Sequence, residues 1–224
     1  PQAGMATDAL ASSSPSPNIP EAQQTASPSP DAQVVFDTDI DLEMCLTQNK
    51  DFVAWLSIPG TVISYPVVRS DDSAYYLSHL FSGKKSKLGC LFSLKSSDYR
   101  QPSQNIAIYG HHLSHSDAMF STLIDYKQES YYAEHSVITL DSIYGRRCYR
   151  IFAVLNMKVS DWEPSRTTFS GDAAFMAFVN RAKSESLYDT GVEVGADDPI
   201  LTLITCDRSY AGKEGRLVIL AVER

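Results

Sequence analysis

The protein has 224 residues, of which 43% are hydrophobic and 21% charged, with a formal net charge of −8 at pH 7. These values indicate one globular domain with an extension. The sequence contains no basic cluster, which argues against nucleic acid and anionic membrane surfaces as partners. It also contains no apolar run near the roughly 20 residues of a membrane span, and no signal peptide.

The first segment, residues 1–33, differs in composition from the rest. It holds six of the eleven prolines, six serines and seven alanines, and it has no aromatic residue. Such a segment buries too little apolar surface to offset the entropy lost on ordering. We therefore expect a disordered Pro/Ser/Ala-rich spacer at 1–33 and a folded domain at 34–224.

The remaining chain is rich in short β-type runs separated by turn residues such as Pro59-Gly60 and Tyr144-Gly145. The expected strands are 54–58, 61–68, 89–94, 105–110, 136–141, 148–157, 199–205 and 216–222. The expected helices are 37–49, 73–80, 117–123, 128–135 and 172–184. The last has an apolar stripe typical of an amphipathic helix. Many strands with only peripheral helices favour a mainly β fold, a closed or nearly closed barrel.

The middle of the chain places a histidine directly after a short buried strand. Residues 106–109 are followed by Gly110, which allows a tight exit, and then by His111. A side chain at a strand end is rigidly supported and can still face a cleft. Of the five histidines, His111 therefore has the context most suited to catalysis, although a single histidine is weak evidence.

The last two strands carry a cysteine and an arginine. Cys206 ends one apolar run and Arg216 opens the next, with a polar stretch between them that we expect to be a loop. If these strands are neighbours, a nucleophile and a permanent positive charge emerge at one end of the sheet, as acyl transfer requires. A disulfide at Cys206 would exclude this chemistry. Of the other three cysteines, Cys90 and Cys148 are expected to be small buried side chains, and no spacing suggests a zinc site.

Together these elements carry a resemblance. The segments Thr202-Leu-Ile-Thr-Cys206 and Ile108-Tyr-Gly-His111, and the ten-residue spacing from Cys206 to Arg216, resemble the motifs of class B sortases. Sortases are the cysteine transpeptidases of Gram-positive cell surfaces. Further matches extend the similarity over roughly residues 35–224, at 51–68, 75–79, 89–92 and 119–123. The resemblance implies an eight-stranded sortase-type barrel with an N-terminal helix and a long helix before the Cys206 strand.

The resemblance also implies catalytic roles. Cys206 would be the nucleophile, His111 the proton-transfer partner, and Arg216 the group that steadies the substrate and the oxyanion. His112 competes with His111, but the family pattern places the histidine directly after the glycine. The acidic Asp207 should oppose thiolate formation unless it points away or pairs with Arg208.

The implied reaction is cleavage after Thr in an Asn-Pro-x-Thr type C-terminal sorting motif on secreted proteins. A thioester acyl-enzyme would then transfer the protein to a peptidoglycan precursor (lipid II) amine. No cofactor or metal is expected. The enzyme would act on the extracellular face of a Gram-positive membrane, held by an N-terminal anchor absent from this chain.

Substrate contacts are expected from the segment 160–169 and from five individual residues. These five are Ser73, Leu77, Trp162, Ile204 and Thr205. Trp162 would be the largest contact surface, with ordinary packing under a loop as the alternative.

Three other functions stay open. The first is a pilin-polymerising sortase with a lysine acceptor, and the second is a hydrolytic cysteine endopeptidase. The third is a non-catalytic β-barrel binding module, in which Cys206 would be unreactive. Selective alkylation of Cys206 separates enzyme from module, and dependence on added amine separates transpeptidase from protease.

Overall fold

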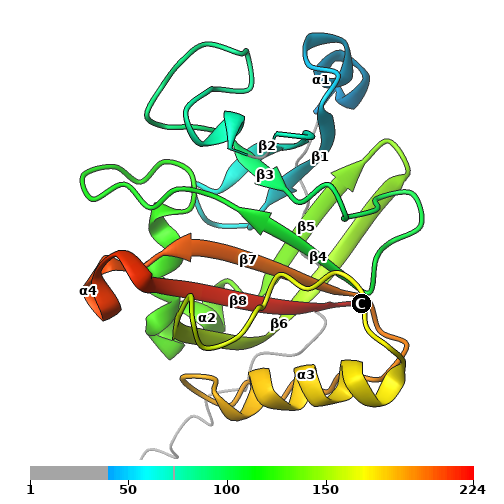
Figure 1. The fold of residues 1–224 in the computed structure, drawn as a ribbon, viewed down its shortest axis with the longest axis vertical. Coiled ribbons are helices and arrows are strands. Elements are labelled where there is room, and N and C mark those ends of the chain that lie inside the picture. The colour runs from blue at the N-terminus through cyan, green and yellow to red at the C-terminus, as the bar shows by residue number, and fades with distance from the viewer. Residues whose placement is uncertain (1–39, 73) are drawn as a thin grey trace, which may run out of the picture. The chain divides into compact units, whose positions relative to one another are not determined.

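Eight strands close into a barrel in the computed structural model, which describes residues 40–72 and 74–224 (Figure 1). The expected spacer at 1–33 and the expected substrate contact Ser73 lie outside the described residues. The strands are β1 (Phe52–Ser57), β2 (Ser64–Arg69), β3 (Leu91–Ser93), β4 (Asn105–Tyr109), β5 (Val137–Ser142), β6 (Gly145–Lys158), β7 (Ile200–Cys206) and β8 (Gly215–Glu223). Each corresponds to an expected strand, and the prediction of a mainly β barrel is confirmed.

The order around the barrel is β1-β2-β3-β4-β7-β8-β6-β5, and β5 pairs back onto β1. Two neighbouring pairs, β2–β3 and β4–β7, are parallel. The other pairs are antiparallel. Closure removes the exposed sheet edges that would otherwise invite aggregation.

The helices lie outside the barrel. They are α1 (Leu42–Gln48), η1 (Tyr75–Leu77), η2 (Ser121–Lys127), α2 (Glu129–Glu134), α3 (Asp172–Ser184), α4 (Arg208–Ala211) and η3 (Gly212–Glu214). The helix α1 begins later than expected because Asp41 caps it, its carboxylate accepting from the Met44 amide at 2.8 Å. The stretch after Cys206 was expected to be a loop. It forms α4 and η3, because the Asp207 carboxylate accepts from the Ser209 amide at 3.1 Å and starts a helical turn.

The apolar run before Cys206 is continuous because β7 is buried on both faces. Leu201 and Leu203 belong to the cluster that fills the barrel. Ile200 and Ile204 belong to a second cluster, which packs β6, β7 and β8 against Phe175 and other residues of α3. A strand covered on both sides loses the alternating pattern of a half-exposed strand. The two cores fix the position of the strand that ends in Cys206.

The parallel pairing of β4 and β7 brings two strand ends together. Tyr109 pairs with Ile204, and the Gly110 amide donates to the Ile204 carbonyl at 3.2 Å. Figure 1 shows the arrowheads of β4 and β7 pointing the same way, with α4 beyond the end of β7. His111, which comes just after β4, and Cys206, the last residue of β7, therefore lie at one end of the barrel.

Candidate active site

The Cys206 thiol and the Arg216 guanidinium come from directly paired positions. Cys206 is opposite Arg216 in the antiparallel register of β7 and β8. Residues opposite each other in such a pair project from the same face of the sheet, with Cβ atoms about 5 Å apart. The Arg216 Nη1 donates to the carbonyls of Lys213 and Gly215 at 2.9 and 2.8 Å, which holds the guanidinium against its own loop. The expected juxtaposition of thiol and positive charge is present.

His111 is held at the end of β4 by close packing around Gly110. A Cβ on Gly110 would lie 2.5 Å from Leu91 Cδ2 and 2.7 Å from the Phe120 ring, so a side chain there would displace the turn. The His111 Nε2 lies 2.8 Å from the Leu77 carbonyl oxygen. A carbonyl can only accept, so Nε2 carries the proton in this arrangement. Leu77, one of the expected substrate contacts, therefore also orients the imidazole through its backbone, and its side chain is 44% exposed.

His112 has a different partner. Its Nδ1 donates to the main-chain carbonyl of Cys206 at 2.8 Å. The bond ties the segment after β4 to the last residue of β7. The two adjacent histidines thus do different things here: His112 fixes the backbone of Cys206, and the His111 ring lies against the carbonyl of Leu77.

A groove of about 390 Å³ opens beside Arg216. Its lining residues come from β4, the end of β6, the following loop and the strands β7 and β8. They are Tyr109, Met157, Val159, Trp162, Glu163, Pro164, Ser165, Ile204 and Arg216. Burial raises the pKa of Tyr109, and Glu163 adds to that rise, while Ser165 and Arg216 oppose it. The groove is apolar at its floor and carries one charge of each sign, a combination suited to an extended peptide.

Trp162 lines this groove and is also anchored to α3. Its ring packs edge-on against Phe178 with centroids 5.0 Å apart, and the Arg181 guanidinium lies 5.1 Å from the ring centre. Its Nε1 donates to Glu185 at 2.9 Å. The indole therefore packs on α3, as the packing alternative expects, and it also borders the groove; its contact with substrate stays a prediction.

The two remaining expected substrate contacts, Ile204 and Thr205, belong to β7 and are buried. Ile204 is 4% exposed and contributes to the groove. Thr205 is 2% exposed, and its hydroxyl donates to the Gly110 carbonyl at 2.8 Å. Its side chain joins β7 to the end of β4, so we assign it a structural role.

Sequence reasoning missed Asn105, which tethers the groove loop to the barrel. Its side chain is fully buried. Its Nδ2 donates to the carbonyls of Pro164 and Arg166 at 2.9 and 3.0 Å, and its Oδ1 accepts from the Thr202 hydroxyl at 2.8 Å. An amide at the first position of a buried strand is the only hint that the sequence offered.

The four thiols differ in environment. All four are free, so no disulfide removes Cys206 from reaction. Burial raises the pKa of Cys90 to about 12, despite an opposing backbone hydrogen bond from Leu91. Burial also raises the pKa of Cys45 and of Cys148, the latter half-buried and so more open than expected. Neutral thiols are poor nucleophiles, so three of the four are chemically disfavoured.

Asp207 pairs with a cation other than Arg208, the one candidate partner that the sequence had suggested. The Asp207 side chain is fully buried and forms an ion pair with Lys127 from η2. Its Oδ1 also accepts from the Ser209 hydroxyl at 2.6 Å. Burial alone would raise the pKa of Asp207, but Lys127 and Ser209 outweigh it, so the pKa is lowered. Lys127 lies 80 positions before Asp207 in the sequence, which is why local reasoning did not find it.

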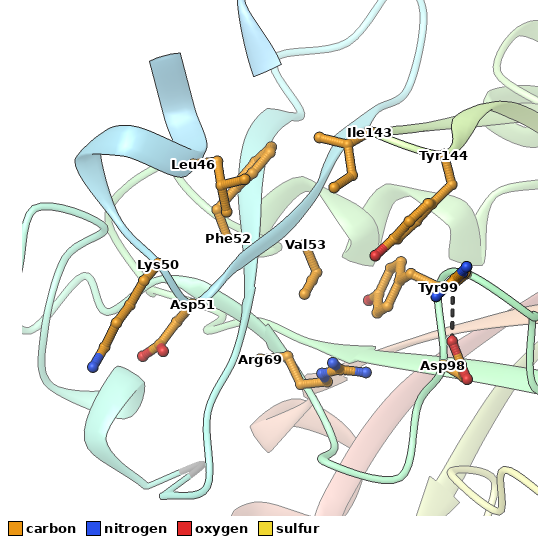
Figure 2. A pocket seen from close by; sticks show the side chains of 11 residues that line it. Leu46, Lys50, Asp51, Phe52, Val53, Arg69, Asp98, Tyr99, Ile143 and Tyr144 are labelled. Carbon is orange, nitrogen blue, oxygen red and sulfur yellow. Dashed lines mark hydrogen bonds between the residues drawn. The ribbon is translucent and has the colours of Figure 1, made fainter. Parts of the chain in front are cut away.

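A second hollow, of about 320 Å³, lies near α1 and the β5–β6 hairpin. Figure 2 shows Tyr99 and Tyr144 facing it from one side, and Leu46 and Phe52 from the other. Arg69, the last residue of β2, also lines it. The register aligns Arg69 with Ser93 of β3, and none of His111, Cys206 and Arg216 lines the hollow. The hollow is therefore not part of the candidate active site.

Within residues 40–72 and 74–224, no group of three or more His, Cys, Asp or Glu side chains is placed to hold a metal ion. In the same part of the chain, no helix combines the length and the hydropathy needed to cross a membrane.

Comparison with known proteins places this geometry in a family. The Sortase domain matches residues 56–224. Sortase B of Staphylococcus aureus is 31% identical over 173 residues, 77% of this chain and 70% of that protein. Sortase B of Listeria monocytogenes is 33% identical over 175 residues, 76% of this chain and 69% of that protein.

Solved structures agree. The Staphylococcus aureus sortase B–substrate complex has a TM-score of 0.76 at 30% identity, covering 82% of this chain and 84% of that one. Clostridium perfringens sortase B has a TM-score of 0.75 at 30% identity, covering 81% and 98%. The barrel, its helices and the sequence similarity over most of the chain all lead to one assignment: the protein belongs to the sortase family of cysteine transpeptidases, among the class B sortases.

Proposed function

We propose that this sortase cleaves an Asn-Pro-x-Thr type sorting motif after Thr and transfers the acyl fragment to a peptidoglycan-precursor amine. The observation that carries the proposal is the pairing of Cys206 with Arg216 beside a peptide-sized groove, at the strand end that also holds His111. Sortases act at the cell surface, and for this chain we propose an N-terminal anchor that holds the domain on the extracellular face of the membrane.

In the first half-reaction, the Cys206 thiolate attacks the carbonyl carbon of the motif threonine. The carbonyl electrons move onto oxygen, and the resulting oxyanion lies within reach of the Arg216 guanidinium. As the tetrahedral intermediate collapses, the C–N bond breaks and His111 gives a proton to the departing amine. The product is a thioester between Cys206 and the threonine.

In the second half-reaction, the acceptor amine attacks the thioester carbonyl and loses a proton to His111. The C–S bond breaks, which returns the Cys206 thiolate and leaves a new amide. Competition from water decides between transfer and hydrolysis. The apolar floor of the groove, formed by Ile204 and Met157, favours transfer because it restricts water near the thioester.

The substrate would run along the groove between the loop that carries Trp162 and the β8 side with Arg216. The groove has the volume for a short peptide segment, and Glu163 and Arg216 offer polar contacts among mostly apolar lining residues. The solved complex of Staphylococcus aureus sortase B with a substrate shows that a protein of this fold holds one. Leu77, exposed next to His111, would border the same substrate from η1.

Cleavage of two fluorogenic peptides tests the proposal, one containing Asn-Pro-Gln-Thr and one of the Leu-Pro-x-Thr-Gly type. We expect cleavage of the first alone, its loss in Cys206→Ala, and its retention in Cys148→Ala, which removes a half-buried thiol from the start of β6. Equal activity of Cys206→Ala and wild type would refute the nucleophile.

The acceptor is tested separately. We expect an added peptidoglycan-type amine to be incorporated into the product and to increase turnover. Incorporation only of a lysine-bearing pilin-type peptide would instead support the pilin-polymerising alternative. A rate and product unaffected by any amine would identify a hydrolytic endopeptidase.

A further inference from the structure

The carboxylate next to the proposed nucleophile is buried and charged. Asp207 follows Cys206 directly, and its side chain is fully shielded from solvent. An unpaired carboxylate in such a place would either take up a proton or rotate out toward water. Near a thiol, its negative charge would also oppose thiolate formation. The position therefore needs a cation and a fixed orientation.

Lys127 at the end of η2 supplies both. Its Nζ pairs with Asp207 Oδ2 and donates to the Ser209 hydroxyl at 3.2 Å. Ser209 in turn donates to Asp207 Oδ1 through its hydroxyl at 2.6 Å and through its amide at 3.1 Å. The three side chains form a closed triangle. Lys127 is itself mostly covered, with 24% of its side chain exposed, so solvent screens the pair weakly.

This triangle is linked to the other reacting groups through one carbonyl. The Asp207 amide donates to the Gly215 carbonyl at 2.9 Å, and the Arg216 Nη1 donates to the same oxygen at 2.8 Å. The contact is tight, since a Cβ on Gly215 would lie 2.1 Å from the Asp207 carbonyl oxygen. A shift of Asp207 therefore moves the support of the Arg216 guanidinium as well as the backbone of Cys206.

We propose that Lys127 is a positioning residue of the transpeptidase reaction. Its ammonium fixes and neutralises the Asp207 carboxylate, and this removes an uncompensated negative charge from beside the Cys206 thiol and holds Arg216 in place. The inference rests on the proposed role of Cys206 as the nucleophile. Lys127 acts through Asp207 and need not touch the substrate. The other charged or titratable groups around this strand end include His111 and His112 after β4, Arg208 and Tyr210 in α4, Lys213 and Glu214 in η3, Arg216 in β8, and Glu163 beside Arg216 in the groove.

Four variants test the role. Lys127→Met keeps the length of the side chain and removes the charge, Lys127→Arg keeps the charge, and Asp207→Asn removes the carboxylate. The fourth combines Lys127→Met with Asp207→Asn. The matched control is Lys95→Met, which breaks a Lys–Asp pair of 2.8 Å that is open to solvent, with side chains 73% and 84% exposed.

For each variant, kcat and KM for the cleaved peptide are measured together with the rate of Cys206 alkylation between pH 5 and 10. We expect Lys127→Met to lower kcat/KM by about 10- to 100-fold, mostly through kcat, because the reacting groups lose their alignment. We expect the midpoint of its alkylation profile to rise by about one pH unit. Lys127→Arg should stay within about threefold of wild type, since the charge remains. The double variant should recover both readouts in part, because no uncompensated charge is left.

Three results would overturn the inference. They are wild-type behaviour of Lys127→Met, a loss of its activity with an unchanged alkylation profile, and a double variant no better than Lys127→Met. Melting curves measured by circular dichroism identify a temperature at which all variants are folded. Assays at that temperature exclude unfolding as the cause of lost activity. If the peptide is the wrong substrate, no variant cleaves it, and the alkylation profiles still decide the role of Lys127. If wild-type Cys206 does not alkylate, the nucleophile itself is refuted.

Discussion

The buried amide of Asn105 offers a sharp test of how the groove is built. The substitution Asn105→Ala removes two donors to the carbonyls of Pro164 and Arg166 and one acceptor for the Thr202 hydroxyl. Each hydrogen bond contributes about 1 kcal/mol net, so the loss should be about 3 kcal/mol in the free energy of unfolding. For a domain of this size that corresponds to a fall in Tm of about 6–12 °C.

The same substitution should act on substrate binding. The carbonyls that Asn105 holds belong to the segment that lines the groove through Trp162, Glu163 and Pro164. With that segment released, we expect KM for the sorting peptide to rise more than kcat falls, because the strand ends that carry Cys206 and His111 are untouched. Peptide kinetics below the lowered Tm measure this split.

A matched variant separates the hydrogen bonds that Asn105 makes to the groove loop from the one that it makes to β7. Thr202→Val has a similar shape and removes only the hydrogen bond to Asn105 Oδ1, so it should cost about 1 kcal/mol and leave KM unchanged. The reasoning is refuted if Asn105→Ala unfolds at the wild-type temperature, or if it is destabilised with KM unchanged.

Three further predictions concern the surroundings of the nucleophile. Gly215→Ala should cost about 2 kcal/mol or more and abolish most activity, because its Cβ would lie 2.1 Å from the Asp207 carbonyl oxygen. Gly195→Ala, whose Cβ would meet its nearest neighbour, the Asp198 carboxylate, at 3.5 Å, should behave like wild type in the same denaturation and activity assays. In the folded protein, iodoacetamide should label Cys206 before the other thiols, since burial raises the pKa of Cys45, Cys90 and Cys148; mass spectrometry showing Cys148 labelled first would contradict this. The lowered pKa of Asp207 means that its ionised form stabilises the fold above the unfolded value of about 3.9, a contribution lost as pH falls through the lower folded value. The stability advantage of wild type over Asp207→Asn should therefore shrink from about pH 5 downward, and a constant difference in urea unfolding would argue against the ion pair.

Local patterns in the sequence were sufficient to predict the strands and the order of the candidate reactive residues along the chain. The apolar run before Cys206, the glycine before His111 and the apolar run after Arg216 each report the conformation of a few consecutive residues. A strand buried on both sides, such as β7, has an unmistakable composition, and so does the apolar stripe of α3. These features predicted the barrel and its three candidate reactive residues, whose catalytic roles stay predictions until the variants are assayed.

The partners of those residues came only from the tertiary structure. Lys127 meets Asp207 across 80 positions (207 − 127 = 80), Asn105 holds a loop about 60 positions away, and the Leu77 carbonyl meets His111 34 positions later. The hydrogen-bond or ion-pair partner of a lysine or an asparagine cannot be read from the neighbouring sequence. The partner depends on closure of the barrel, which brings segments distant in the sequence to one strand end. The sequence therefore determined which residues could react, whereas closure of the barrel decided which charges and hydrogen bonds surround them.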